Sequence, residues 1–364
     1  MSSELYVGLM SGTSLDGVDA VLVDFSGKAP RILACAHRPF AAALRAELLA
    51  LNGASSNELE RAAHCANALS RVYASAVGEA LALASVPAAA VRAVGCHGQT
   101  VRHRPDAGYT IQLGNAALLA ELCGARVVAD FRSRDVAAGG QGAPLAPAFH
   151  AAVFRSAGED RAVLNLGGIA NLTWLPARGD VTGFDCGPGN SLMDRWAELH
   201  LGTPIDRDGA WAAGASADSA VFERLLEEPY FALPPPKSTG RDLFNESWLR
   251  ARLPRGAEPQ AVQATLLELT ARSASDALRR FCHGARRLIV CGGGVHNRAL
   301  MARLRELLAP IPVDSSDLHG VDPSLVEAAA FAWLARQTLE QKPSSLPAVT
   351  GARGPRVLGA VYPP

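Results

Sequence analysis

The sequence predicts an α/β protein of two domains, each organised around a β-hairpin with a glycine-rich polar tip. In the first half, the apolar runs Leu5–Leu9 and Val18–Phe25 flank the segment MSGTSLDG. In the second half, Arg161–Leu166 and Leu172–Leu175 flank the segment GGIAN. Further short apolar runs alternate with stretches of helical periodicity in both halves, and this alternation is typical of α/β folds.

Length and composition limit the classes of function. The 364 residues are enough for about two domains, and 49% of them are hydrophobic, so each domain can bury a core. Lys plus Arg and Asp plus Glu both number 35, and the net charge of +0 argues against non-specific nucleic-acid binding. The 7 cysteines are widely spaced without a CxxC pair, which favours reduced thiols over disulfides or a zinc site.

The N-terminal and apolar segments predict the compartment. The N-terminus has no basic segment followed by a cleavable apolar run. Charges or prolines interrupt the long alanine-rich runs, so none of them reads as a membrane span. We therefore expect a cytoplasmic protein without membrane or nucleic-acid partners.

The first domain is expected to comprise residues 1–133. The polar sequence HGQT directly follows a predicted strand, at the kind of strand end where open α/β sheets bind ligands, so His97 and Gln99 are candidate binding residues. Beyond the hairpin, the pattern predicts strands over Arg31–His37, Val91–Cys96, Tyr109–Leu113 and Val127–Ala129, and helices over Ala41–Leu51, Glu58–Ala84 and Asn115–Cys123.

The second domain is expected to comprise residues 134–364 and to begin with a glycine- and proline-rich hinge or substrate loop over 137–147. Residues 202–260 are expected to be irregular, and the proline-rich tail from Gln341 is expected to be loosely held. Beyond the hairpin, the pattern predicts strands over Val181–Phe184 and Arg287–Cys291 and helices over Leu192–Leu201, Val262–Cys282, 297–308 and Pro323–Leu339.

The turn of the first hairpin has the residue types of an anion cradle. Its two glycines, Gly12 and Gly17, can adopt positive φ so that backbone N–H groups converge, and Ser11 and its neighbours add hydroxyls. Asp16 would repel a phosphate unless a cation lay between them, and the Mg²⁺ of a nucleotide is such a cation. The alternative is an ordinary polar hairpin turn.

Three glycine-rich elements occur in the order expected for a nucleotide held between two similar domains: residues 8–17, 167–171 and 292–294. The two hairpins would contact phosphates, and the GGG turn would let adenosine lie against bare backbone. None of the three is a Walker A sequence or a GxGxxG fingerprint. The order of the three elements therefore carries more information than any one of them.

Seven segments carry a more specific resemblance: MSGTSLDGVD, HGQT, DFRSRD, GGQGAPLAPAFH, LNLGGIANLT, FDCGPGN and CGGGVHN. Together they closely resemble the anhydro-N-acetylmuramic acid kinase family, part of the actin/hexokinase/Hsp70 superfamily of ATPases and sugar kinases. The matches run from residue 8 to residue 335, nearly the whole chain. The resemblance implies a two-domain actin/hexokinase-like, ribonuclease H-like fold with a central cleft for ATP and a sugar.

The resemblance also implies a reaction. The family uses ATP and water to convert 1,6-anhydro-N-acetylmuramic acid, a product of peptidoglycan turnover, to N-acetylmuramic acid 6-phosphate, in peptidoglycan recycling and amino-sugar catabolism. O6 of the anhydro sugar is an ether oxygen without a proton, so water must attack C1 while O6 accepts the γ-phosphoryl group. One carboxylate can activate that water, as in glycoside hydrolysis.

By the family match this base is Asp185. Its position supports the role, because it follows a predicted strand and precedes a Gly-Pro-Gly turn and a helix. The alternative is that Asp185 only caps that helix.

The family match assigns nucleotide contacts to the three glycine-rich elements. Asp16 would approach Mg²⁺ through a metal-bound water, the second hairpin would contact phosphates, and the GGG turn would hold adenosine. The implied cofactor-binding residues are Gly12, Thr13, Ser14, Leu15, Asp16, Gly17, Val18, Asp19, Asn165, Gly167, Gly168, Gly292, Gly293, Gly294 and Asn297.

The same match implies contacts to the sugar. Arg132 in DFRSRD would pair with the lactyl carboxylate or with the developing phosphate charge, and its alternative is an ion pair with Asp130 or Asp135. The HGQT side chains would hydrogen-bond the sugar, although its histidine also fits a structural role. Glu327, in the apolar segment VEAAAFAWLA, fits either a ligand contact or a solvated helix face.

Several alternatives stay open at the level of sequence. One is another small-molecule kinase of the superfamily that acts on a free hydroxyl, and another is an ATP-driven binding or assembly protein. The 9 histidines form no HxxxH or HExxH pattern, which argues against a catalytic zinc and against the metal-dependent tRNA-modifying branch of the superfamily. The run Lys237–Arg241 fits a solvated loop or a phosphate clamp, and a homodimer is expected by analogy with the family.

Overall fold

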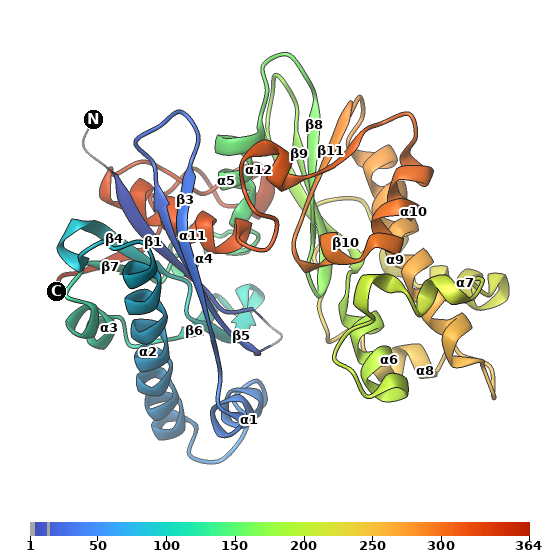
Figure 1. Ribbon diagram of the computed structural model, residues 1–364, viewed down its shortest axis with the longest axis horizontal. Coiled ribbons are helices and arrows are strands. Elements are labelled where there is room, and N and C mark those ends of the chain that lie inside the picture. Colours follow the sequence, from blue (N-terminus) through green and yellow to red (C-terminus); the bar gives the residue numbers. More distant parts are fainter. Residues whose placement is uncertain (1–3, 13–14) are drawn as a thin grey trace. The chain divides into compact units, whose positions relative to one another are not determined.

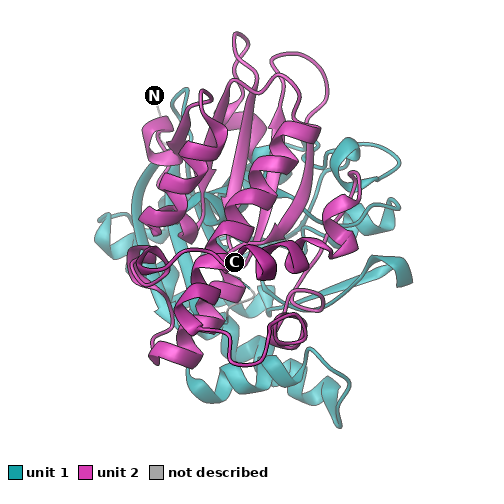
Figure 2. Ribbon diagram, turned by 90° about the vertical axis from the view of Figure 1, so that its right-hand side faces the viewer, with its two compact units in different colours: residues 1–149, 325–364 teal, residues 150–324 magenta. Residues whose placement is uncertain are grey.

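The computed structural model describes residues 4–12 and 15–364. These residues form two compact units, unit 1 with residues 1–149 and 325–364 and unit 2 with residues 150–324 (Figure 1, Figure 2). The predicted boundary between residues 133 and 134 differs from this division, since both ends of the predicted second domain belong to unit 1. The reason is packing: helix α11 (Val326–Leu339) lies on the first sheet, and Thr350 donates a 2.8 Å hydrogen bond to Asp135.

Unit 1 contains a six-stranded sheet in the order β13-β7-β4-β1-β2-β3, and a separate two-stranded ribbon of β5 and β6. Strands β1, β2 and β3 form an antiparallel meander, β4 and β7 continue the sheet in parallel, and β13 pairs antiparallel to β7. The strands are β1 (Leu5–Met10), β2 (Gly17–Asp24), β3 (Arg31–Pro39), β4 (Val91–Cys96), β5 (Gln99–Arg104), β6 (Tyr109–Leu113), β7 (Val127–Ala129) and β13 (Ala360–Tyr362).

Two long helices cover the sheet of unit 1. The odd residues of β1 point into a core shared with α2 (Glu58–Leu83), whereas Gly8 faces α11, as the alternation of side chains along a strand requires. The C-terminal tail, expected to be loosely held, is tied to this unit through β13 and through Leu358, which is 0% exposed. The other helices before residue 155 and near the C-terminus are α1 (Ala42–Ala50), α3 (Ala116–Cys123), α4 (Ser133–Ala137), α5 (Ala146–Phe154) and α12 (Pro347–Thr350).

Helix α11 lies directly against the backbone of two neighbouring strands. Gly8 of β1 and Gly95 of β4 are partners in the parallel register. A Cβ built on Gly8 would overlap the carbonyl oxygen of Ala328, and one built on Gly95 would overlap the carbonyl oxygen of Phe331. Glycine is therefore required at both positions for the helix to approach the sheet this closely.

Unit 2 contains a five-stranded sheet in the order β10-β9-β8-β11-β12. Strands β8, β9 and β10 form an antiparallel meander, and β11 and β12 continue the sheet in parallel. The elements are β8 (Arg161–Leu166), β9 (Ile169–Leu175), β10 (Thr182–Pro188), α6 (Ser191–Leu201), α7 (Ser219–Leu226), α8 (Glu246–Arg250), α9 (Pro259–Phe281), β11 (Arg287–Cys291), α10 (Arg298–Leu308) and β12 (Val313–Ser315). Residues 202–260, predicted to be irregular, thus contain two short helices.

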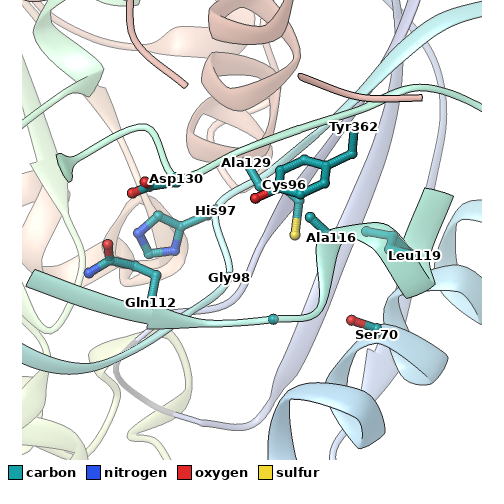
Figure 3. Close-up of a pocket in the computed structure, with 11 residues that line it drawn as sticks. Ser70, Cys96, His97, Gly98, Gln112, Ala116, Leu119, Ala129, Asp130 and Tyr362 are labelled. Carbon is teal, nitrogen blue, oxygen red and sulfur yellow. The ribbon is translucent and has the colours of Figure 1, made fainter. Parts of the chain in front are cut away.

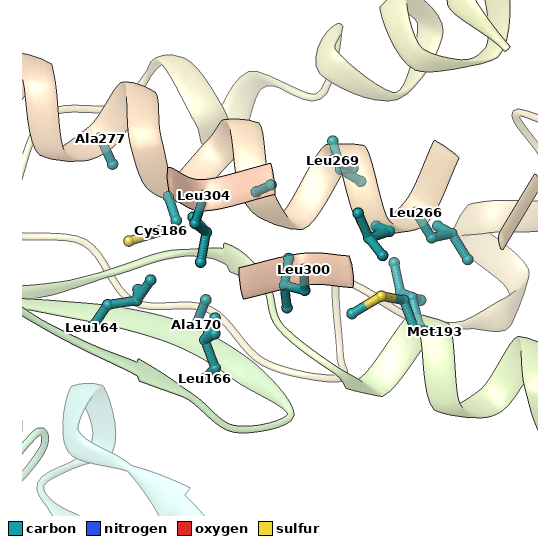
Figure 4. Packing of buried hydrophobic residues seen from close by; sticks show 14 of the residues in the cluster. Leu164, Leu166, Ala170, Cys186, Met193, Leu266, Leu269, Ala277, Leu300 and Leu304 are labelled. Atoms are coloured by element: carbon teal, nitrogen blue, oxygen red, sulfur yellow. The ribbon is translucent and has the colours of Figure 1, made fainter. Parts of the chain in front are cut away.

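The core of unit 2 lies between the meander and helices α9 and α10. Figure 4 shows Leu164, Leu166 and Ala170 of the β8–β9 hairpin on one side of this core, with Leu266 and Leu300 among the helical side chains on the other. All of these side chains are buried, and their burial supplies the main driving force for folding of the unit. The core fixes the hairpin and β10 against α9.

The two sheets repeat one topology. In each unit three antiparallel strands lie in the order third, second, first, and a fourth and fifth strand follow in parallel beside the first. The sheet of unit 1 adds β13 at its edge to this plan, and the β5–β6 ribbon lies outside it. The predicted α/β class with a β-hairpin at the start of each half is thereby confirmed, and the duplicated topology agrees with the ribonuclease H-like repeat of the actin/hexokinase superfamily. No helix within the described ranges has both the length and the apolar character that a membrane crossing requires.

The close approach of α11 predicts the effect of adding one methyl group. We expect Gly95→Ala to lower the free energy of unfolding by about 2 kcal/mol or more, because the strand and the Phe331 carbonyl must separate. The matched control is Gly78→Ala in the exposed middle of α2, where a Cβ meets nothing within 4 Å and should raise stability by about 0.5–1 kcal/mol. Urea denaturation of both variants measures the difference, and equal stabilities would contradict the packing described.

Candidate active site

The turn between β1 and β2 is hydrogen-bonded to the residues that follow β4 in unit 1. Ser11 Oγ lies 2.9 Å from the Tyr73 hydroxyl and donates to the carbonyl oxygen of Gly98 at 3.2 Å. Gln99 Nε2 donates to the carbonyl oxygen of Gly12 at 3.2 Å. The Ser11 hydroxyl is thus buried and engaged within the protein, so the expectation that it adds to an anion cradle is wrong. Thr13 and Ser14 lie outside the described residues.

The predicted phosphate residues of this hairpin differ in what they present. Leu15 and Val18 are buried side chains, so only their backbone groups are available to a ligand. Among the described residues of the turn, Leu15 has a positive φ of 57°. Gly17 does not adopt positive φ, which corrects the expectation; it is needed because a Cβ there would overlap the Arg38 carbonyl on β3. Asp19 is bound to His37 Nδ1 at 2.8 Å on the surface.

His97, Arg132 and Glu327 form one cluster beside this turn. Arg132 donates from Nε and Nη2 to His97 Nε2 at 3.1 and 2.9 Å, and from Nη1 to the carbonyl oxygen of Gly142 at 2.8 Å. The His97 ring packs at a tilt against the Phe331 ring, with the centroids 4.7 Å apart, and Phe331 lies one helical turn beyond Glu327 in α11. The structure therefore brings together three predicted sugar-binding residues from distant parts of the chain.

Burial decides the charges of this cluster. Burial, followed by the nearby charge of Arg132, holds the pKa of His97 well below its ordinary value, although the backbone of Gly98 and Ser11 opposes this. Burial also lowers the pKa of Arg132 to about 10, against the attraction of Glu327 and Asp135. At neutral pH the cluster thus combines a neutral imidazole with a guanidinium cation. Because a guanidinium only donates hydrogen bonds, His97 Nε2 accepts and the ring proton is on Nδ1.

The alternative ion pair of Arg132 with a neighbouring aspartate is only partly present. The Asp135 carboxylate accepts hydrogen bonds from the Gly142 N–H and from the Thr350 hydroxyl, both at 2.8 Å, and acts on Arg132 through its charge. The direct partners of Arg132 are instead His97 and Gly142. Gln99 is also buried, and its Oε1 has no hydrogen-bond partner among the described residues. Buried acceptors are normally satisfied, so this oxygen is suited to a ligand donor.

A cavity of about 200 Å³ lies beside His97 within unit 1 (Figure 3). Its polar lining comes from Ser70, His97, Gln112 and Asp130, and Tyr362 of β13 closes one part of it. Both HGQT residues that line it, His97 and Gly98, follow the end of β4, where the sequence predicted a ligand. The cavity is therefore part of the same strand-end region.

In unit 2, the second hairpin is bonded to the turn that follows β10. The N–H groups of Gly189 and Asn190 donate to the carbonyl oxygens of Gly168 and Gly167 at 3.0 and 2.8 Å. Asn190 Nδ2 donates to the carbonyl oxygen of Leu166 at 2.9 Å. These bonds hold the hairpin tip in a fixed shape. Asn190 was not singled out from the sequence, although its place after Gly-Pro-Gly at a helix start was a usable signal.

The GGG turn lies against the second hairpin. Gly292 has a φ of 84°, and a Cβ on Gly294 would come within 2.5 Å of the Leu166 side chain. The Asn165 side chain lies beside Gly292. The structure thus groups the predicted nucleotide residues Asn165, Gly167, Gly168, Gly292, Gly293 and Gly294 within one unit. Asn297 accepts from the Leu300 N–H at 3.0 Å as the N-cap of α10, so its side-chain oxygen already has a structural partner.

Asp185 lies at an irregularity of the edge strand β10, where the register with β9 shifts between Asp185 and Gly187. Such bulges redirect side chains and are common beside active sites. Its Oδ2 accepts from the Thr239 N–H at 3.0 Å. Burial raises the pKa of the half-buried Asp185 carboxyl to about 6, against the Thr239 N–H and the charge of Lys237.

The helix-capping alternative for Asp185 is excluded by the geometry. Helix α6 begins after Asn190, and the Asp185 carboxylate accepts a hydrogen bond from Thr239 instead. The run Lys237–Arg241 is also not simply a solvated loop: Lys237 and Thr239 are half-buried and lie against Asp185. The contact between Thr239 and Asp185 could not be inferred from the sequence, because these residues are 54 positions apart and nothing in their spacing links them.

Comparison with known proteins places the chain in a family. The model of the anhydro-N-acetylmuramic acid kinase family matches residues 4–364. The chain belongs to this family. It is 57% identical over 374 residues to the anhydro-N-acetylmuramic acid kinase of Variovorax paradoxus, with 100% of both chains covered. It is 58% identical over 365 residues to that of Bordetella petrii, with 99% of this chain and 96% of the relative covered.

Solved structures similar to the chain are more distant. The (R)-2-hydroxyglutaryl-CoA dehydratase component A of Acidaminococcus fermentans has a TM-score of 0.49 at 12% identity and covers 91% of this chain and 98% of its own. A ROK family glucokinase of Streptomyces griseus in complex with glucose and AMPPNP has a TM-score of 0.42 at 15% identity, covering 92% and 99%.

Membership of the anhydro-N-acetylmuramic acid kinase family confirms the prediction of an ATP-dependent kinase. It also removes the alternative of an ATP-driven binding or assembly protein. The predicted site residues fall into two groups, one in each unit: Gly12, His97, Gln99, Arg132 and Glu327 in unit 1, and the glycine-rich elements with Asp185 in unit 2.

The raised pKa of Asp185 predicts a cost in stability. Folding favours the protonated carboxyl, so the charged carboxylate destabilises the protein above pH 6, and this penalty fades as the pH falls toward the unfolded value of 3.8. We expect Asp185→Asn, which retains an acceptor for Thr239, to raise the free energy of unfolding at pH 8 by about 1–3 kcal/mol. The gain should shrink to roughly half a kcal/mol at pH 4. Urea denaturation at both pH values measures it, and a gain independent of pH would contradict the assignment.

Proposed function

We propose that the chain hydrolytically opens 1,6-anhydro-N-acetylmuramic acid and transfers the γ-phosphoryl group of ATP to O6, giving N-acetylmuramic acid 6-phosphate and ADP. The observation that carries the proposal is the environment of Asp185, a half-buried carboxylate with a pKa of about 6 beside a glycine-rich strand end. The names of the relatives support the substrate.

The substrate dictates what the base must do. O6 is bonded to C1 and has no proton, so a base cannot turn it into a nucleophile as it would a sugar hydroxyl. Asp185 instead takes a proton from a water, whose oxygen bonds to C1 as the C1–O6 bond breaks. The electron pair of that bond stays on O6, which accepts the phosphoryl group. A carboxylate with a pKa of about 6 is largely ionised at neutral pH and is still a stronger base than an ordinary aspartate.

The cluster in unit 1 supplies the contacts for the sugar. The Arg132 guanidinium is a fixed cation, suited to the lactyl carboxylate or to the developing phosphate charge. Gln99 offers a buried acceptor for a sugar hydroxyl. His97, held neutral and oriented by Arg132, contributes shape and a ring proton rather than charge. Glu327 is the acidic counterpart at the start of α11.

The glycine-rich elements supply the contacts for ATP. The two hairpins present backbone N–H groups to phosphates. In the Gly292–Gly294 turn, Gly293 is the residue that offers bare backbone to adenosine, because a Cβ there would meet no atom closer than Asn190 Nδ2 at 4.0 Å, whereas Gly292 and Gly294 pack against the second hairpin. Within the described residues, no group of three or more His, Cys, Asp or Glu side chains is arranged to bind a metal ion. Mg²⁺ would be carried by the nucleotide, with Asp16 acting through a metal-bound water. When bound, the cation neutralises phosphate charge and favours phosphoryl transfer.

The setting of the reaction follows from the substrate. We propose that the protein acts in the cytoplasm, where ATP is present, on sugars released by peptidoglycan turnover, and that it forms a homodimer as expected from the family. Multi-angle light scattering of the purified chain tests the dimer, and a monomeric mass at micromolar concentration would contradict it.

The function is tested by comparing two sugars. The unaltered chain should form ADP and a 6-phosphorylated sugar with 1,6-anhydro-N-acetylmuramic acid, as detected by mass spectrometry. Turnover of plain N-acetylmuramic acid alone would identify a kinase that acts on a free hydroxyl, and would overturn the proposal.

The role of Asp185 is tested by one amide substitution. We expect Asp185→Asn to lower kcat by about 10²–10⁴-fold and to leave the affinity for ADP within about threefold, because the base is lost but the glycine-rich elements remain. The matched control is Asp218→Asn in the same unit, where Asp218 caps α7 through the N–H groups of Ala220 and Val221 and asparagine can do the same. Normal turnover of Asp185→Asn would remove Asp185 from the role of base.

A further inference from the structure

The segment Lys237–Thr239 lies along the open edge of β10. The Asp185 N–H donates to the Lys237 carbonyl oxygen at 3.1 Å, and the Thr239 N–H donates to Asp185 Oδ2 at 3.0 Å. One short segment therefore binds both the backbone and the carboxylate of the same residue. β10 is an edge strand, and this segment satisfies an N–H that the sheet leaves unpaired.

The Lys237 side chain is held by Tyr230, an aromatic residue that also bonds Asp185. Lys237 Nζ donates to the Tyr230 carbonyl oxygen at 3.2 Å and lies 4.7 Å from the centre of the Tyr230 ring. The same nitrogen is 5.9 Å from the centre of the Phe281 ring on α9. Tyr230 in turn donates from its hydroxyl to the Asp185 carbonyl oxygen at 2.8 Å. Tyr230 thus contacts both the lysine and the aspartate and limits the positions open to the ammonium group.

We propose that Lys237–Thr239, here named the strap, positions Asp185 for catalysis: the Thr239 N–H fixes Oδ2, Oδ1 takes the proton of the attacking water, and the Lys237 ammonium favours the charged carboxylate. Among the described residues, Oδ1 receives no hydrogen bond, in contrast to Oδ2. The proposal rests on the proposed function in one respect: the water that Oδ1 deprotonates is the one that attacks C1 of the sugar. Lys237 and Thr239 are positioning residues, because they act through Asp185.

The other titratable groups facing Asp185 are neutral under working conditions. They are Tyr230, and Cys186 on β10 itself with Cys282, the residue that follows α9, beside it. Burial raises the pKa of all three groups, so none carries a charge at neutral pH. Arg280 acts on Lys237 rather than on the carboxyl. Among the described residues, Lys237 is thus the one whose charge lowers the pKa of Asp185, against the rise that burial causes.

This arrangement determines where the proton and the bonding electrons go. Water loses a proton to Asp185 Oδ1, its oxygen forms the bond to C1, and the C1–O6 bond breaks toward O6, which accepts the phosphoryl group from ATP. Lys237 stays protonated throughout. Fixing one carboxylate oxygen removes the rotation that would otherwise exchange the two oxygens and so orients the base for the water.

The test measures the titration of Asp185 directly. Carbon-13 NMR of protein labelled at aspartate carboxyls follows the Asp185 resonance, assigned by its loss in Asp185→Asn. We expect Lys237→Met, which keeps the length and apolar contact of the stem, to raise the midpoint of that titration by at least about half a pH unit. The matched control Lys237→Arg keeps the charge and should leave the midpoint within about 0.3 units. An unchanged midpoint in Lys237→Met would overturn the proposal.

The kinetic readout separates this proposal from the proposed function. The acidic limb of the pH profile of kcat/KM should move upward with the NMR midpoint in Lys237→Met, at unchanged thermal midpoint. The NMR titration needs no turnover, so it decides the role of the strap even if the unaltered chain fails to convert the anhydro sugar. Should Lys237→Met not fold, Lys237→Gln removes the same charge and the same shift is expected. An NMR shift without a kinetic shift would contradict the catalytic part of the proposal.

Discussion

The approach of α11 to β1 and β4 is the constraint on which the polar strand-end cluster of unit 1 depends. Gly8 and Gly95 are paired in the sheet and leave no side chain between strand and helix, so the backbone carbonyls of α11 lie against them. The same helix then carries Phe331 onto the ring of His97 and places Glu327 near Arg132. A packing requirement of the core thereby determines the orientation of polar groups at the strand ends. It also explains why a segment after residue 324 belongs to the unit that begins the chain.

In unit 2 the corresponding feature is a half-buried carboxylate at the edge of a sheet. Asp185 costs stability when ionised, and the protein retains it with a bulge, a backbone donor and a nearby cation. Structural carboxylates usually have lowered pKa values, whereas functional sites often hold groups whose pKa is raised toward neutrality. The arrangement agrees with a base that removes a proton from water near neutral pH. In the role that we propose, the Lys237–Thr239 segment orients this base.

Much of this was predictable from sequence because it rests on local patterns. The two hairpins, the strand before HGQT and the glycine turn before α10 follow from apolar runs bounded by Gly, Ser and Asn. The rest depends on contacts between distant residues. The hydrogen bond from Thr239 to Asp185 joins positions 54 apart. The packing of α11 and β13 on the first sheet is likewise not indicated by any local periodicity. Gly17 shows the same limit: its place in a turn suggested positive φ, but a neighbouring strand is what excludes a side chain there.

In the reaction that we propose, water attacks C1 of the sugar while ATP phosphorylates O6. The most direct measurement is the position of oxygen-18 in product formed in H₂¹⁸O and quenched early, before the anomeric oxygen exchanges with solvent. We predict one labelled oxygen on C1 of the 6-phosphorylated sugar and none in its phosphate group. Label in the phosphate, or an unlabelled sugar, would contradict the role of Asp185 as the base that activates water.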